Sequence, residues 1–293
     1  MKIEFKKAFV VLPLVAAVAA CGGGGNDGSK DAAPLGVGGT SKGGGTGDDR
    51  AAALAQGPVA APTASAAAAA VTAPVVVTPT SRFLILGNDI NEANLVEMGI
   101  DQRPDGGVVM MDNLSLIGAD AAVDSVAGDA SFAMGRWARG TFRLFSFDQP
   151  IPAGSTGYHY IVFDRVTAFP SSGTYTCGAG TFTLPSRMAG SSQPTGLATG
   201  SASLSFSPAG ALVQASIQVR ASGVLGGITE TTANEPLETP DHFFKTPGFH
   251  DSTGNGMLLT IGAAPGNAMR VVAAYQVPLR AGYRGIATFV CTP

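Results

Sequence analysis

The most regular alternation in the chain is Ser201-Ala202-Ser203-Leu204-Ser205-Phe206-Ser207, in which serine takes every second position. A turn signal, Pro208-Ala209-Gly210, follows it, and apolar and polar residues then alternate from 213 to 220. A period of two residues is typical of a strand with one buried and one solvated face. The two stretches therefore predict an antiparallel hairpin.

Similar short runs lie on both sides of this hairpin, separated by Gly, Pro and Ser. They cover 83–86, 108–111, 131–137, 141–147, 158–164, 174–177, 181–184, 257–261, 269–277 and 283–291. No segment keeps a 3.6-residue period for three turns, so long helices are not expected. We predict an all-β domain over 82–293, a single antiparallel up-and-down β-barrel of about eight strands, because closure removes exposed strand edges. A two-sheet β-sandwich is the alternative.

The N-terminus has the parts of an export signal. Lys2, Lys6 and Lys7 precede an uncharged apolar run over 8–20, which is too short to span a bilayer as a helix. The run ends in Val18-Ala19-Ala20-Cys21, which resembles a bacterial lipobox. The resemblance implies that residues 1–20 are removed and that Cys21 is lipidated, so that acyl chains anchor the protein. In the sorting pattern of such lipoproteins, Gly22 rather than Asp after the cysteine favours the outer membrane over retention in the inner membrane.

A segment of low complexity follows Cys21. Residues 21–81 consist mainly of Gly, Ala, Ser, Thr and Pro, and they offer few large side chains to bury. Such a composition favours disorder. We interpret this segment as a tether of about 60 residues, with a root-mean-square span of roughly 40 Å.

The chain has three cysteines. With Cys21 assigned to lipid, Cys177 and Cys291 remain, and an even pair in an exported domain predicts a disulfide. Two free thiols or a metal-binding pair are the alternatives, although no CxxC motif or His-rich segment supports a metal.

The composition limits the possible partners. Only 13% of the residues are charged and the formal net charge is −3. Nucleic-acid binding is not expected, because it requires a basic stripe. The expected partners are the membrane, through the lipid, and a protein or small molecule at the barrel loops.

One segment stands out as a candidate ligand site. Asp241-His242 and His250-Asp251 enclose Phe243, Phe244 and Phe249, an unusually aromatic loop. The residues His242, Phe243, Phe244, Phe249 and His250 either grip an apolar ligand or cap one end of the barrel. The histidines are not presented together by a regular helix, so neither a metal nor another cofactor is predicted.

Other polar residues have structural interpretations. His159 lies in an apparent strand between tyrosines, where it is expected to pack against aromatic side chains. Arg136 and Trp137 are neighbours in another strand, so they point to opposite faces. We expect Trp137 in the core and Arg136 at the surface. No motif typical of a serine hydrolase is present, which leaves no predicted catalytic residue.

Four short stretches resemble the C-terminal β-barrel of transferrin-binding-protein-B-like lipoproteins. They are Phe132-Ala133-Met134-Gly135-Arg136-Trp137, Tyr158-His159-Tyr160-Ile161-Val162, Pro170-Ser171-Ser172-Gly173-Thr174-Tyr175 and Gly200-Ser201-Ala202-Ser203-Leu204-Ser205-Phe206. The resemblance covers about 128–291. It implies an eight-stranded barrel with a filled interior and functional loops at one end, without transferring an iron-transport role.

These features predict an outer-membrane lipoprotein that acts as a non-enzymatic binding or interaction module. A periplasmic structural or assembly lipoprotein is one alternative. A hydrolase that uses the His242 and His250 loop is another.

Overall fold

The structure is a computed structural model that describes residues 71–87, 90–152, 156–188, 196–222, 227–250, 254–279 and 282–293. Of Asn91, Glu92 and His250 it describes the backbone alone. The described residues belong to the larger of two compact units, Gln56–Pro293. The predicted signal peptide, Cys21 and most of the predicted tether lie outside the described residues.

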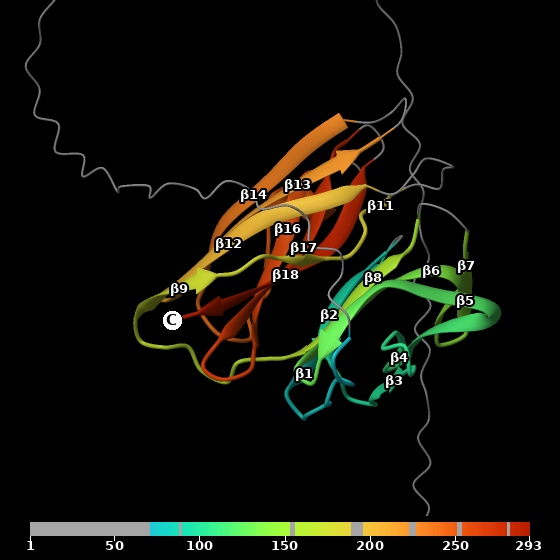
Figure 1. Cartoon of the computed structure of the whole chain (residues 1–293), viewed down its shortest axis with the longest axis horizontal. Coiled ribbons are helices and arrows are strands. Elements are labelled where there is room, and N and C mark those ends of the chain that lie inside the picture. Colours follow the sequence, from blue (N-terminus) through green and yellow to red (C-terminus); the bar gives the residue numbers. More distant parts are fainter. Residues whose placement is uncertain are drawn as a thin grey trace, which may run out of the picture. The chain divides into compact units, whose positions relative to one another are not determined.

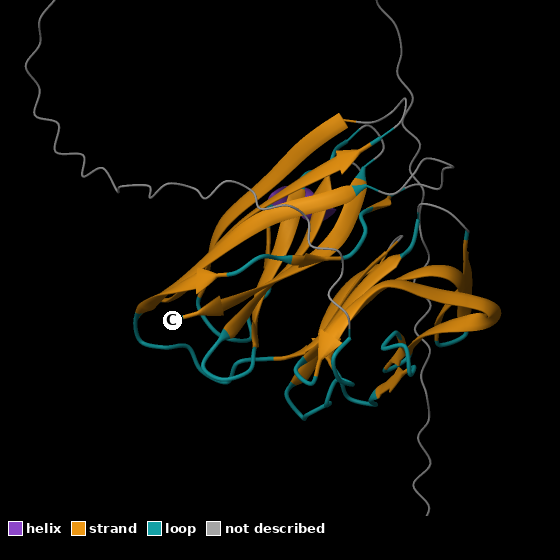
Figure 2. Ribbon diagram, in the orientation of Figure 1, coloured by secondary structure: helices purple, strands orange, loops and turns teal. Residues whose placement is uncertain are grey.

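The all-β prediction is confirmed, and the strands form two antiparallel sheets (Figures 1 and 2). The first, here called the curled sheet, holds β1 (Ser81–Gly87), β2 (Ile90–Leu95), β3 (Ile100–Gln102), β4 (Val108–Met111), β5 (Leu114–Asp129), β6 (Phe132–Leu144), β7 (Phe147–Ile151) and β8 (Tyr158–Asp164). The second, here called the barrel, holds β9 (Gly173–Cys177), β10 (Thr181–Phe182), β11 (Ser186–Arg187), β12 (Leu197–Ser207), β13 (Gly210–Ala221), β14 (Gly227–Leu237), β15 (Phe244–Lys245), β16 (Gly256–Ala263), β17 (Met269–Val277) and β18 (Tyr283–Thr292). The helix described is the short 3-10 turn η1 (Pro247–His250). No helix within the described ranges is long and apolar enough to cross a bilayer.

The barrel is an antiparallel meander that is nearly closed, in the order β14-β13-β12-β9-β18-β17-β16-β15. The predicted hairpin is β12 and β13, with Leu204 opposite Val213 and both side chains buried. The last strand returns to the first, since β18 pairs with β9. β14 lies against β16 and β17 at the remaining seam.

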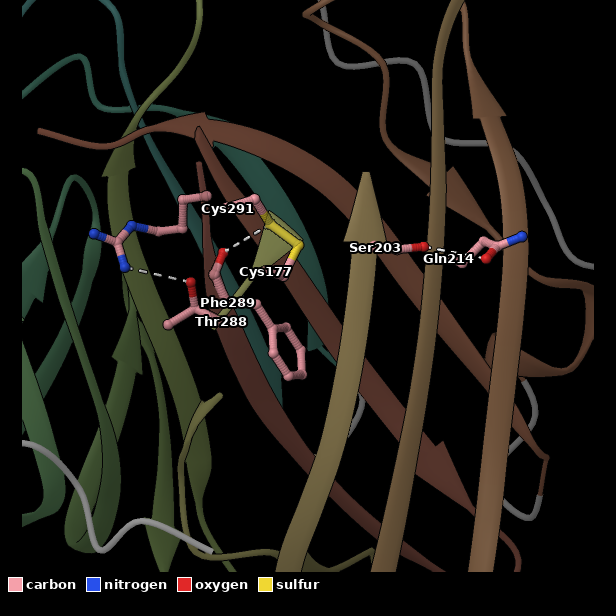
Figure 3. The surroundings of a disulfide bond; sticks show 7 residues. Cys177, Ser203, Gln214, Thr288, Phe289 and Cys291 are labelled. Atoms are coloured by element: carbon pink, nitrogen blue, oxygen red, sulfur yellow. Dashed lines mark hydrogen bonds between the residues drawn. A yellow bond between two sulfur atoms is a disulfide. The ribbon is translucent and has the colours of Figure 1, made fainter. Parts of the chain in front are cut away.

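A disulfide joins the two strands that close the barrel. Cys177 of β9 and Cys291 of β18 are direct cross-strand partners, with Cα atoms 3.8 Å apart and an S–S bond of 1.99 Å (Figure 3). The predicted disulfide is therefore confirmed. It covalently links strands that are 114 residues apart in the sequence.

The curled sheet has the order β2-β1-β8-β6-β5-β4-β3, with β7 paired to β6. Its own core lies against one face and centres on Trp137, which is fully buried among Phe142, Tyr158 and Tyr160. The indole Nε1 donates a hydrogen bond of 2.7 Å to the Val108 carbonyl oxygen. The prediction that Trp137 lies in the core is confirmed.

A third core cluster joins the two sheets. From the curled sheet it contains Leu84, Leu86, Phe132, Met134, Ile161 and Phe163, and from the barrel it contains Phe249, Leu258, Val272, Ala274 and Ile286. Alternate residues of β1 consequently face two different cores, with Phe83 and Ile85 on one side and Leu84 and Leu86 on the other. A strand that is apolar on both faces needs cover on both faces, and the barrel wall supplies the second.

The structure corrects the predicted boundaries. The barrel strands begin at β9, so two of the four stretches that carry the family resemblance, in β6 and β8, belong to the curled sheet. The predicted tether ends earlier than Ser81, because Thr72 and Val76 donate backbone hydrogen bonds of 3.0 Å to Gly128 and Ala130. Val75 packs against the core of the curled sheet, which gives this segment apolar area to bury.

Candidate functional site

An open cleft of about 750 Å³ lies where the chain passes from the curled sheet to the barrel. Its walls come from the residues before β1, the end of β8 and the linker after it, β9, the turn between β16 and β17, and the C-terminus. The polar lining residues are Thr78, Thr80, Asp164, Arg165, Thr167 and Asn267, and the apolar ones include Val166, Tyr175 and Met269. This mixture of donors, acceptors and one aromatic ring suits a small polar ligand.

Hydrogen bonds hold one wall of the cleft in place. Asp164 Oδ1 accepts bonds from the hydroxyl groups of Thr78, at 2.9 Å, and Ser81, at 2.5 Å. The backbone of Arg165 pairs with that of Gly262 in β16 through an isolated antiparallel β-bridge. A Cβ atom at Gly262 would lie 2.6 Å from the Phe163 ring and 3.0 Å from the Asp164 carbonyl oxygen. Glycine is therefore required at position 262, because β16 and the end of β8 approach each other too closely there for a side chain.

Arg165 connects the cleft to the predicted aromatic segment. Its guanidinium forms an ion pair with Asp241, and Arg82 donates to the same carboxylate oxygen at 3.1 Å. The Arg82 guanidinium also lies 5.0 Å from the centre of the Phe243 ring, a cation–π contact. Asp241 thus fixes the orientation of Arg165, although the four predicted ligand-binding residues whose side chains are described, His242, Phe243, Phe244 and Phe249, do not line the cleft.

The predicted aromatic residues are packed to different degrees. Phe249 is 1% exposed and belongs to the core that the two sheets share. Phe244 lies in β15 and packs against the barrel core, while Phe243 is half-buried. His242 is exposed, and its carbonyl oxygen accepts a hydrogen bond of 3.1 Å from the Thr260 hydroxyl. The side chain of His250 lies outside the described residues. Packing between the sheets accounts for Phe249 and Phe244, and ligand binding by this segment remains a prediction.

A buried polar relay connects the two sheets at His159. Its Nε2 atom lies 2.6 Å from Ser186 Oγ, and its Nδ1 atom lies 2.8 Å from Thr183 Oγ1. Thr183 Oγ1 already accepts the Ile286 N–H at 2.9 Å and donates to the Ile286 carbonyl oxygen at 3.3 Å. A neutral imidazole has one N–H donor and one acceptor nitrogen, so His159 donates to one of these two hydroxyl groups and accepts from the other. Sequence analysis predicted aromatic neighbours for His159 and missed these hydroxyl partners.

The relay has the connectivity of a nucleophile, a base and an orienting group, but it is inaccessible. Ser186, His159 and Thr183 are all fully buried. Burial lowers the pKa of His159 well below its usual value, and the positive charges of Arg136 and Arg284 lower it further. A base with so low a pKa, out of reach of a substrate, is poorly suited to activating a serine. The relay therefore serves as a neutral hydrogen-bonded junction between β8 and the barrel.

This junction predicts a pH dependence of stability. In the unfolded chain His159 binds a proton near pH 6.5, whereas the folded chain keeps it neutral. Below about pH 6.5 the unfolded state binds one more proton than the folded state. The free energy of unfolding therefore decreases as the pH is lowered, by at most about 1.4 kcal/mol per pH unit for one group. The loss continues until the pH reaches the lowered folded pKa.

The variant His159→Asn provides the control, because asparagine does not titrate. The free energies of unfolding of the wild-type protein and of His159→Asn should be measured in urea at several pH values between 7 and 5. The difference between the two should become smaller as the pH is lowered. A gap that stays constant over this range would show that His159 is protonated equally in both states.

Several arginines of the described residues are buried, and for Arg136 this is contrary to expectation. Arg136, predicted at the surface, is 3% exposed, and its Nε atom donates a bond of 2.8 Å to Asp124. The barrel covers the face of β6 on which Arg136 lies, which explains the correction. Arg270 is 1% exposed, stacks on the Phe132 ring at 3.7 Å and lies 3.7 Å from Asp129. Burial lowers the Arg270 pKa to about 10, although Asp129 opposes this shift.

The part of the chain that the structure describes contains no cluster of three or more His, Cys, Asp or Glu side chains able to hold a metal ion. In comparisons with known proteins, no family model, curated protein or solved structure matches this chain. The cleft and the buried junction must therefore be interpreted from their own geometry.

Proposed function

We propose that this chain is an exported lipoprotein of a bacterial outer membrane, anchored through Cys21, whose folded part is a binding or interaction module. The observation that carries the proposal is the sequence Val18-Ala19-Ala20-Cys21 directly after a basic and then an apolar segment. The Cys177–Cys291 disulfide supports export, because such bonds persist in oxidising compartments. The resemblance of four sequence stretches to transferrin-binding-protein-B-like lipoproteins is part of the same proposal.

The cleft between the sheets supports the binding role. Small-molecule sites are typically concave, with a few polar groups that fix the ligand's orientation. Arg165, Asp164 and Asn267 provide such groups in a cleft of about 750 Å³. The ion pair with Asp241 and the hydroxyl bonds to Asp164 hold two of these side chains in place. We assign the ligand to this cleft in preference to the Phe243–Phe249 region.

The substitution Cys21→Ala tests the anchor. The reaction that attaches the diacylglycerol requires the cysteine thiol, so the variant should remain an unprocessed precursor that incorporates no labelled palmitate. The wild-type chain should incorporate the label and fractionate with the outer membrane. The matched control is Cys177→Ser/Cys291→Ser, which leaves Cys21 in place and should incorporate palmitate normally. Equal labelling of wild type and Cys21→Ala would contradict the proposal.

A further inference from the structure

One end of the curled sheet gathers its turns and several exposed apolar side chains. A row of cross-strand partners, Ile100, Met111, Leu114, Leu144 and Phe147, crosses β3, β4, β5, β6 and β7 near this end. Directly paired residues share a face of the sheet. The middle of the row is fully buried, whereas Phe147 at the edge strand is 57% exposed. The apolar row therefore continues beyond the part of the sheet that is covered.

Two further apolar side chains project beside this row. Phe145, in the turn between β6 and β7, is 74% exposed, and Met98, in the turn between β2 and β3, is 66% exposed. They are the most exposed large hydrophobic residues of the described ranges. The backbone N–H groups of Glu97 and Met98 both bond Asp112 Oδ1 at 2.9 Å, which places the Met98 turn beside the turn between β4 and β5. We call Met98, Phe145 and Phe147 the apolar tip.

The backbone at Phe145 is strained. Its φ of 53° lies in the left-handed region, which bulky side chains rarely adopt and which glycine adopts freely. Strain of this kind persists where the surrounding structure imposes it, and it is common at functional sites. A large aromatic side chain that is both strained and exposed contributes nothing to the core, so an external contact is the simplest reason for its presence.

Three polar side chains beside the apolar tip, Asp112, Arg143 and Asp148, already have hydrogen-bond partners. Arg143 and Asp148 form a two-pronged ion pair directly behind Phe145 and Phe147, with both distances 2.7 Å. Asp112 accepts two backbone N–H groups. The cleft lies on other residues, and the tip offers apolar side chains that protrude from two turns and an edge strand. Exposed apolar side chains do not need hydrogen-bonding partners at fixed positions. They therefore suit the interfacial region of a bilayer better than the pocket of a partner protein.

We infer that the apolar tip rests reversibly in the interface of the membrane that holds the lipid anchor. This inference rests on the proposed function, because three side chains alone bind a bilayer weakly. The tether predicted from the composition, about 50 residues between Cys21 and Val71, would as a flexible chain span roughly 40 Å and hold the tip at an effective concentration on the order of millimolar. The exposed acids Glu97 and Asp101 favour a zwitterionic surface over an anionic one.

The test uses the lipidated full chain in phosphatidylcholine vesicles that carry a quencher in the upper acyl chains. A fluorophore is attached through Ser146→Cys, the second residue of the β6–β7 turn. Ala209→Cys is the matched control, since Ala209 is the second residue of the two-residue turn between β12 and β13. We expect at least a twofold quenching at position 146 and none at position 209, with the quenching at 146 reduced by anionic lipid at low salt.

Phe145→Gly combined with Phe147→Ser separates contact from folding. Glycine relieves the strain at 145, so the variant should fold normally and still sediment with vesicles through its lipid, yet lose the quenching at position 146. If the chain labelled at position 146, with Phe145 and Phe147 unchanged, sediments with the vesicles but shows no quenching, the inference is overturned and the lipid anchor stands. The same result is expected if the apolar tip binds a protein. Failure of the wild-type chain to sediment would overturn the anchor and the inference together.

Discussion

Replacing both Cys177 and Cys291 by serine is expected to lower the free energy of unfolding by about 3–5 kcal/mol. The reason is that the bond closes a loop of 114 residues and so restricts the unfolded chain. For a domain of this size the melting temperature should fall by on the order of 10 °C. The closing strands of the barrel, β9 and β18, lose their covalent link at the same time.

The chain contains one tryptophan, and this makes the prediction sharper. Trp137 lies in the core of the curled sheet, whereas the disulfide lies in the barrel. Because the sheets share a core and the His159 junction, the tryptophan fluorescence transition should coincide with the far-ultraviolet circular-dichroism transition, to which the strands of both sheets contribute. Wild-type protein treated with a reductant should reproduce the serine variant. An unchanged Trp137 transition in both would contradict a single cooperative unit.

Phe249→Ala is expected to cost about 3–5 kcal/mol, the range for removing a large buried aromatic side chain from a core. Phe249 is 1% exposed and packs in the cluster that joins η1 to both sheets. His242→Ala, in the same segment but exposed, should change stability by less than about 0.5 kcal/mol. Urea unfolding of the two variants provides the comparison. If Phe249 served mainly to grip a ligand, its loss would leave the stability of the unliganded protein almost unchanged.

Alternation in the sequence was sufficient to predict the barrel hairpin. In β12 and β13 one face is buried and the other is solvated, so apolar and polar residues must alternate, and they do so over both strands. The pairing of Cys177 with Cys291 was also accessible, because the resemblance of residues 18–21 to a lipobox left two cysteines for one disulfide. These features depend on local pattern and on residue counts, which a single sequence contains.

The sandwich alternative already contained two sheets, but a nearly closed barrel beside a separate curled sheet was not predicted, and the reason is visible in β8. Its residues are buried on both faces, so they alternate between two cores and show no polar face. A continuous apolar run of this kind signals a strand that is covered twice. Interpreted in that way, the run over 158–163 predicts a second layer against β8. Arg136 is the direct cross-strand partner of His159, so it would lie under the same layer.

The cleft could not be predicted from the sequence. Its residues come from five separate segments between Thr78 and Pro293, and each segment on its own resembles an ordinary turn or strand end. Ser186 and Thr183 likewise gain their significance only from the approach of His159, which is more than 20 residues away. Long-range packing brings such groups together, and no local period records it.

The most direct test of the lipoprotein proposal is the intact mass of the mature protein purified from the cell envelope, combined with fragmentation of its N-terminus. The account predicts a chain that begins at Cys21, carrying a diacylglycerol thioether and an amide-linked acyl chain, with two hydrogens fewer for the Cys177–Cys291 disulfide. An unacylated N-terminus, at Cys21 or at any other residue, would contradict it.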